Sequence, residues 1–236
     1  MNVFIKWFPP SWVQIKADGK IIYIDPAYLK WNFMKYPTNV VYSDWPDEID
    51  GMPEHLEKAD LILITHSHKD HCKSVTVDRL KSDGTVIMAP KRAARMIDGA
   101  KVVKPGEEIP LENIVIKVVD AYNTPDGHST RKVHYKGDGV GYLIRIDNKT
   151  IYHAGDTDFI PEMKDLGRID VAMLPIGGTF TIDITEAARA ARAIVPNILI
   201  PMHYKDADMV KLKSEVGIDS AVLVLPMRIG ETVELK

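Results

Sequence analysis

The chain has 236 residues, of which 45% are hydrophobic and 27% charged, a composition typical of a globular protein that can bury a sizeable core. Its formal net charge is -3 and it contains no lysine- and arginine-rich block, so there is no strong signal for nucleic-acid binding. Cys72 is the only cysteine, which excludes an intrachain disulfide and a zinc site made of four thiolates.

The sequence carries no sign of a targeting or membrane-spanning segment. Its first residues lack the charged-then-apolar build of a signal peptide, and no apolar run approaches the roughly 18 residues that a membrane span requires. A single cysteine also suits a reducing compartment. We therefore expect a cytoplasmic protein with one domain over residues 1–236, and the sequence gives no indication of its oligomeric state.

The first quarter of the chain predicts short strands at residues 3–8, 12–15 and 20–24. Residues 25–53 show no clear period and predict a long loop, which in an enzyme often lies over a site. The fully apolar run at residues 61–64 is typical of a strand buried on both faces.

Strands and helices alternate through the rest of the chain, with Asp183 or Thr185 as the expected cap of an alanine-rich helix. Early hairpins followed by this alternation, with the pattern apparently doubled across the two halves, suggest two sheets between helix layers. The expected helices are 74–81, 91–97, 185–195 and 207–215, the expected strands 85–88, 101–103, 114–119, 141–146, 150–153, 171–175, 197–201 and 221–225, and the expected loop 122–139.

A histidine-rich run directly follows the buried strand at residues 61–64. His66, His68, Asp70 and His71 lie within six positions, and His66 and His68 would point to the same side if the extended conformation continues. Imidazole nitrogens and carboxylate oxygens are the ligands that a zinc-like ion accepts without thiolates. This density of histidine favours a metal site over a polar loop.

The pattern His-x-His-x-Asp-His after an apolar strand resembles the signature of the metallo-β-lactamase fold superfamily. The resemblance points to a branch with L-ascorbate-6-phosphate lactonase, N-acyl-phosphatidylethanolamine phospholipase D and uncharacterised metal-dependent hydrolases. It implies an α/β fold, a four-layer αββα sandwich of two mixed sheets between helix layers. Further matching segments follow the family's order: Ile24-Asp25-Pro26, Tyr152-His153-Ala154-Gly155-Asp156-Thr157, Leu174-Pro175-Ile176-Gly177-Gly178 and Ile200-Pro201-Met202-His203-Tyr204.

The resemblance also implies the metal ligands. Taken alone, Asp156 could be a turn aspartate and His203 a core histidine, but each follows a predicted strand, which favours the ligand interpretation. The implied assignment gives His66 and His68 to the first metal, Asp70, His71 and His203 to the second, and Asp156 to both as the bridge.

The third histidine of the first metal is missing from its usual place. Asn123 stands there, shortly after the strand at 114–119, and asparagine is a poor zinc ligand. His128 and His134 follow, and we favour His134 because it lies closer to the glycine-rich turn that leads back into a core strand. His128 is expected at a loop tip. All three residues stay candidates at this point.

The resemblance implies a metal-dependent hydrolase with two divalent metal ions, most simply zinc, with manganese or iron as alternatives. A metal-bound hydroxide would cleave an ester, lactone or phosphodiester bond, with an amide also open, and Asp70 would orient the nucleophile as the catalytic residue. Two such ions, the carboxylates of Asp70 and Asp156 and one hydroxide leave about one positive charge, which favours a small anionic substrate. The alternative is a non-catalytic or mononuclear metal-binding sensor or scaffold, suggested by the asparagine at position 123.

Overall fold

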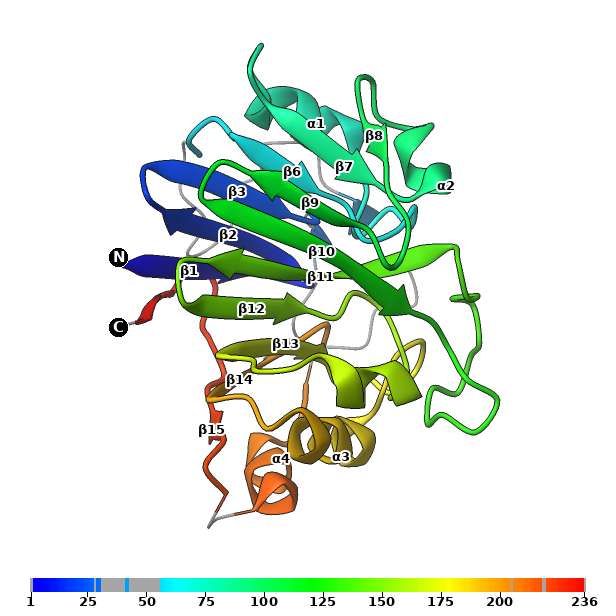
Figure 1. The fold of residues 1–236 in the computed structure, drawn as a ribbon. Coiled ribbons are helices and arrows are strands. Elements are labelled where there is room, and N and C mark those ends of the chain that lie inside the picture. The colour runs from blue at the N-terminus through cyan, green and yellow to red at the C-terminus, as the bar shows by residue number, and fades with distance from the viewer. Residues whose placement is uncertain are drawn as a thin grey trace. The chain divides into compact units, whose positions relative to one another are not determined.

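The computed structural model describes residues 2–27, 29–30, 41–42, 56–204, 206–217 and 220–235. The chain forms two compact units, drawn together in Figure 1. Unit 1 comprises Met1–Val103 and Met227–Lys236, and unit 2 comprises Lys104–Pro226. Each unit is described separately, and the expectation of a single domain over residues 1–236 stays a prediction.

Unit 1 is built on a seven-stranded mixed sheet in the order β16-β1-β2-β3-β6-β7-β8. The strands from β16 to β3 pair antiparallel, and those from β3 to β8 pair parallel. The apolar β6 is buried along its whole length between two parallel neighbours, as its sequence predicts. The elements of unit 1 are β1 (Val3–Phe8), β2 (Trp12–Ala17), β3 (Lys20–Ile24), β4 (Leu29–Lys30), β5 (Val41–Tyr42), β6 (Leu61–Leu63), α1 (Ser74–Leu80), β7 (Val86–Ala89), α2 (Lys91–Ala94), β8 (Lys101–Val102) and β16 (Thr232–Leu235).

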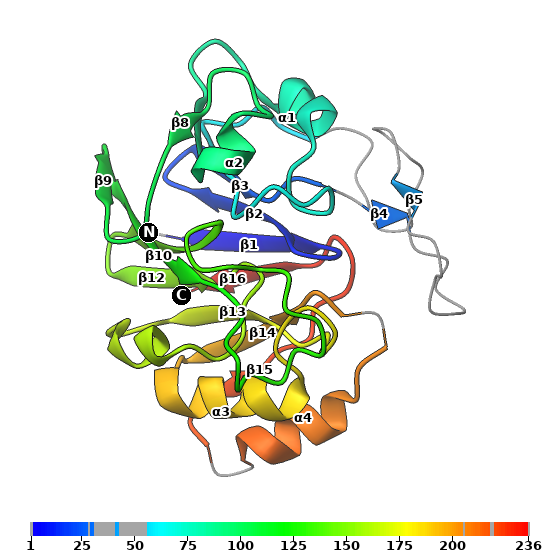
Figure 2. The ribbon, with the colours of Figure 1, turned by 90° about the vertical axis from the view of Figure 1, so that its right-hand side faces the viewer.

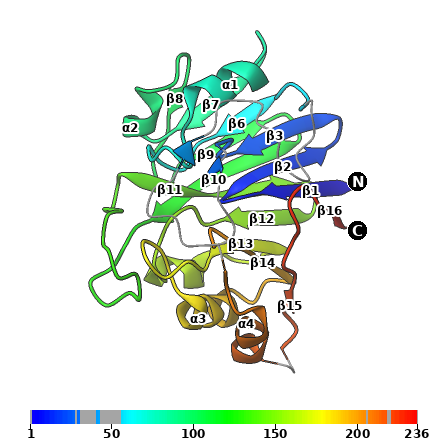
Figure 3. The same cartoon turned by 180° about the vertical axis from the view of Figure 1, so that it is seen from behind.

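The helices of unit 1 bury their apolar side chains against this sheet. Val77 and Leu80 of α1 and Ala93 of α2 share a core cluster with Ile62 and Ile87. The helix expected to reach residue 97 ends at Ala94, and the residues after it form a turn. Strand β16 pairs with β1, so the two ends of the chain lie in neighbouring strands (Figure 3).

Unit 2 is built on a second seven-stranded mixed sheet, in the order β15-β14-β13-β12-β11-β10-β9. Strands β9 to β12 pair antiparallel, and β12 to β15 pair parallel. Its elements are β9 (Glu108–Leu111), β10 (Ile114–Ala121), β11 (Gly139–Ile146), β12 (Lys149–His153), a 3-10 helix (Pro161–Asp165), β13 (Val171–Pro175), α3 (Ile184–Ile194), β14 (Ile198–Met202), α4 (Met209–Val216) and β15 (Leu223–Val224).

Helices α3 and α4 pack side by side along the sheet of unit 2 (Figure 2). The alanines of α3 are buried, and their small side chains let the helix approach the sheet closely. Asp183 caps this helix by accepting a hydrogen bond from the backbone N–H of Glu186, which confirms one of the two expected caps. Asp208 caps α4 in the same way through the N–H of Lys211.

The structure confirms an α/β fold with two mixed sheets and their helices. The residues between β10 and β11 form a loop, as expected. Most of the loop expected at 25–53 lies outside the described residues, although β4 and β5 pair within it. The sequence missed the edge strands β9 and β16 and the 3-10 helix. Among the described residues, every helix is too short or too polar to cross a membrane.

Candidate metal centre

The histidine-rich run of unit 1 folds into a tight turn just beyond β6. The backbone N–H of His71 donates to the carbonyl of His68 and thereby closes the turn. His66 Nε2 lies 3.0 Å from His68 Nδ1, and His71 Nε2 lies 3.8 Å from Asp70 Oδ2. The rings of His66 and His71 are 4.1 Å apart between centroids. All four predicted ligands of this run therefore lie together.

A fully buried carboxyl group, that of Asp25, orients this cluster from the end of β3. Asp25 Oδ2 accepts hydrogen bonds from Thr65 Oγ1 (2.6 Å) and His71 Nδ1 (2.7 Å). Because the Thr65 hydroxyl proton is used in this way, the hydroxyl oxygen accepts from His66 Nδ1 at 3.0 Å. Both imidazoles then carry a proton on Nδ1 and present a lone pair on Nε2, the form a metal ligand needs.

From the sequence, Asp25 was expected only in a turn after a strand, and its hydrogen bonds with Thr65 and His71 were not predicted. Its φ of 46° lies in the left-handed region, which is uncommon outside glycine and concentrates at functional sites. The signal available in the sequence was an aspartate directly after a buried strand.

Cys72 adjoins the cluster, where its thiol keeps its proton. Burial, reinforced by the charge of Asp25, raises the pKa of the Cys72 thiol to about 12. The side chain is buried, and it acts as a small apolar filler beside the predicted ligands.

In unit 2, two predicted histidine ligands from different parts of the chain converge on a carboxyl oxygen of a third predicted ligand, Asp156. Asp156 follows β12, His203 follows β14, and His134 lies in the loop between β10 and β11. His134 Nε2 and His203 Nε2 each lie 3.3 Å from Asp156 Oδ2. Ligand atoms around a tetrahedral zinc ion, each at 2.0–2.1 Å from it, lie about 3.3 Å from one another. The donor set and its spacing therefore fit an aspartate oxygen shared by two metal ligand shells.

The backbone at His203 forms a tight left-handed turn that packs against Gly177. His203 has a φ of 53°, a left-handed backbone conformation that residues other than glycine rarely adopt. The carbonyl oxygen of His203 comes so close to Gly177 that a Cβ there would lie 2.6 Å from it. Glycine at position 177 therefore makes room for the turn that carries His203.

His128 and Asn123 hold different positions from His134. His128 is exposed, its Nδ1 lies 3.0 Å from Asp183 Oδ1, and its backbone N–H donates to Glu186. The side-chain oxygen of Asn123 accepts a hydrogen bond from the backbone N–H of His134. Of these three candidates, the one beside Asp156 is His134.

Comparison with known proteins identifies the family. The family model described as a beta-lactamase superfamily domain matches residues 4–203. A UPF0173 metal-dependent hydrolase of Pyrococcus furiosus is 37% identical over 195 residues, which cover 78% of this chain and 84% of the relative. One from Caldivirga maquilingensis is 31% identical over 223 residues, covering 90% of this chain and 86% of the relative.

Solved structures agree. A structure from Parabacteroides distasonis, named as a metal-dependent hydrolase, is 31% identical with a TM-score of 0.79 and covers 96% of this chain and 93% of its own. A metallo hydrolase from Ignicoccus hospitalis is 27% identical with a TM-score of 0.73, covering 100% and 99%. These matches confirm the predicted metallo-β-lactamase fold and the prediction of a metal-dependent hydrolase. The chain therefore belongs to the beta-lactamase superfamily and, within it, to the UPF0173 family of metal-dependent hydrolases.

Proposed function

We propose that this hydrolase cleaves an ester, lactone or phosphodiester bond of a small anionic substrate at a dinuclear, zinc-type centre. The observation that carries the proposal is the pair of 3.3 Å distances from Asp156 Oδ2 to the Nε2 atoms of His134 and His203. One oxygen facing two imidazole nitrogens suits a bridging ligand. The nitrogen and oxygen donors would also accept manganese or iron.

In this proposal the predicted ligands hold a pair of ions, as the superfamily resemblance implies. His66, His68 and His134 would hold the first ion. Asp70, His71 and His203 would hold the second, and Asp156 would serve both. The support is the resemblance to the superfamily signature together with the ligand-like spacing inside each cluster.

The chain's own residues have defined tasks in the reaction. Bound divalent ions lower the pKa of water to near neutrality and polarise the scissile group. Asp70, half-buried, orients the attacking water and takes up its proton on a carboxylate oxygen. Burial raises the pKa of the Tyr204 phenol, which therefore keeps its proton and is a candidate hydrogen-bond donor to the substrate.

Elemental analysis of the purified protein, combined with a panel of chromogenic phosphodiesters, esters and lactones, tests this function. We expect close to two divalent ions per chain and turnover of one bond class. Asp156→Asn should lower that turnover by at least about 100-fold and reduce the metal content, because the bridge loses its charge. Asp165→Asn, at an exposed aspartate of the same unit, is the matched control and should change neither.

Two results would count against the proposal. Only trace metal in the wild-type protein, with no loss of metal in His66→Ala, would refute the metal centre. One tightly held ion without turnover of any substrate would favour the sensor or scaffold instead, since a catalytic site keeps a position open for water.

A further inference from the structure

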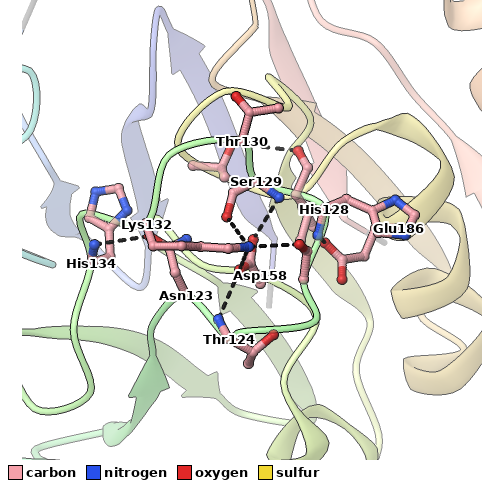
Figure 4. A network of polar contacts seen from close by, with 12 residues as sticks. Asn123, Thr124, His128, Ser129, Thr130, Lys132, His134, Asp158 and Glu186 are labelled. Atoms are coloured by element: carbon pink, nitrogen blue, oxygen red, sulfur yellow. Dashed lines mark hydrogen bonds and ion pairs between the residues drawn. The ribbon is translucent and has the colours of Figure 1, made fainter.

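We propose that Asn123 is a positioning residue for His134, which it holds in the place and in the ring tautomer that a metal ligand requires. The inference rests on the proposed function in treating His134 as a ligand. Asn123 stands where a ligand histidine is expected from the superfamily resemblance, so the asparagine would serve the first metal indirectly. Figure 4 shows both residues in the loop between β10 and β11.

The side chain of Asn123 binds the backbone of the segment that carries His134. Its Oδ1 accepts hydrogen bonds from the N–H groups of Val133 (3.0 Å) and His134 (2.9 Å). The backbone N–H of Asn123 donates in turn to the carbonyl of His134 at 2.7 Å. Three hydrogen bonds thus join position 123 to a segment ten residues later, and they fix where the His134 side chain begins.

A shared acceptor, the carbonyl oxygen of Phe180, sets the ring of His134. Asn123 Nδ2 donates to this oxygen at 2.9 Å, and His134 Nδ1 lies 3.1 Å from it. A carbonyl oxygen can only accept, so the Nδ1 atom that faces it carries the proton. In a neutral imidazole the lone pair is then on Nε2, the atom that faces Asp156.

Only a short planar amide meets these requirements together. Asparagine offers an acceptor to the two N–H groups and a donor to the Phe180 carbonyl. Alanine offers neither. Aspartate would set a carboxylate oxygen against the Phe180 carbonyl oxygen, an arrangement that lacks a donor. The residue type at 123 is therefore matched to its contacts rather than to metal binding.

The first part of the loop is held by a separate anchor. Buried Asp158 accepts hydrogen bonds from Thr124 N (2.8 Å), Ser129 N (3.3 Å) and Lys132 Nζ (3.0 Å), as Figure 4 shows. None of these bonds involves Asn123. Removing the Asn123 amide should therefore release His134 while the loop before it stays folded.

The first test measures His134 directly in the full-length protein, before and after chelation, at about pH 8, above the usual histidine pKa of about 6.5. Long-range 1H–15N NMR, assigned with His134→Gln, should find the proton on Nδ1 in both states. Asn123→Ala should raise the hydrogen-exchange rates of the Val133 and His134 amides by about 10-fold or more, since their acceptor is gone. A wild-type ring protonated only on Nε2, or unchanged amide exchange in the variant, overturns the proposal.

The second test measures zinc binding by competition with a chelator. Asn123→Ala should lower the affinity for one of the two zinc ions by about 10–100-fold and leave the affinity for the other unchanged, as expected for the loss of a residue that orients a ligand. His134→Ala should abolish binding of the same ion. Asn197→Ala is the control: Asn197 is an exposed asparagine of the same unit whose side chain donates to Asp170 Oδ1 at 3.1 Å, so its loss should leave both affinities unchanged.

The outcomes separate the two proposals. Two ions bound equally well by wild type and Asn123→Ala would overturn the role of Asn123 and leave the proposed function standing. A wild-type protein without zinc would contradict the proposed function, while the NMR and exchange data would still decide whether Asn123 holds His134. Loss of the Asn123→Ala fold, detected by circular dichroism, would leave the wild-type tautomer as the deciding result.

Discussion

The imidazoles of His71 and His134 each donate a hydrogen bond from Nδ1, but to different kinds of acceptor. His71 Nδ1 donates to the Asp25 carboxyl group at 2.7 Å, and His134 Nδ1 donates to the Phe180 carbonyl at 3.1 Å. In both cases Nε2 keeps its lone pair. A carboxylate raises the basicity of the ring more than a carbonyl does, so His71 should be the stronger ligand of the two.

Asp25→Asn tests this orientation at the level of one atom. The amide would have to turn its NH2 group toward either Thr65 or His71, and facing His71 it would favour the tautomer with the proton on Nε2. We expect a loss of about 10–100-fold in the affinity of one metal, measured by chelator competition. Asp60→Asn, at an aspartate that accepts from the Ile21 N–H in the same unit, is the control and should leave metal affinity unchanged.

Glu186 gives a residue-scale prediction for pH. Burial, with further contributions from Asp158 and Asp183, raises the pKa of this carboxyl group, and the His128 N–H opposes the shift. The folded state therefore binds the proton more tightly than the unfolded chain, and ionisation of Glu186 lowers stability as pH rises through the folded pKa. Gln keeps an acceptor for the His128 N–H without the buried charge.

Melting curves across pH check this sign. Glu186→Gln should melt above the wild type at pH 8, and the difference should shrink as pH falls below the ordinary glutamate pKa, where the wild-type side chain is protonated in both states. Glu107→Gln, at an exposed glutamate of unit 2, should show no such pH-dependent difference. A constant offset for Glu186→Gln across the range would contradict the prediction.

At the scale of elements, the loop between β10 and β11 depends on Gly127. Its backbone lies against the Asp158 carboxyl group so closely that a Cβ would be 2.2 Å from Asp158 Oδ2. Asp158 is fully buried and anchors both ends of this part of the loop. A side chain at 127 must therefore displace the anchor rather than a free surface group.

Gly127→Ala should destabilise the protein by about 1–3 kcal/mol, measured by denaturant unfolding. Gly84→Ala is the matched control, because a Cβ there meets nothing within 4 Å, and it should change stability by less than about 0.5 kcal/mol. Equal stability of the two variants would show that the loop yields easily around Asp158.

The central strands were predictable, whereas the edge strands β9 and β16 were not. Strands β1, β3 and β13 have the bounds that the apolar runs predict, because burial imposes a hydrophobic pattern on them. Edge strand β9 reads Glu-Ile-Pro-Leu, with a proline and an exposed charge, and β16 is half exposed. Such strands form because a neighbour is present, which local sequence does not encode.

For the whole molecule, the proposed ligands come from distant parts of the chain, so bound metal should stabilise the folded state. A chelator should lower Tm, since each ion that binds only the folded state contributes about 2.7 kcal/mol at 100 times its Kd, which corresponds to several degrees at this size. Added zinc should restore the original value. Asp156→Asn should start from a lower Tm and respond little to the chelator, and an equal response in both proteins would contradict a shared aspartate.

The sequence by itself determined the donor types, their order along the chain and the superfamily, because a dense His/Asp run behind a buried strand is a local pattern. It also favoured His134 over His128, although only by the proximity of His134 to a turn. The edge strands β9 and β16, the shape of the His203 turn and the hydrogen-bond acceptors of the His71 and His134 rings could not be predicted from it.

Only the tertiary structure decided which histidine lies beside Asp156 and which tautomer each imidazole adopts. The partners that decide these points are far apart in sequence: Asp25 lies 46 positions from His71, and Phe180 lies 46 positions from His134. Hydrogen bonds over such separations depend on how strands pair and loops return. Periodicity and motif spacing report only on neighbours a few residues apart.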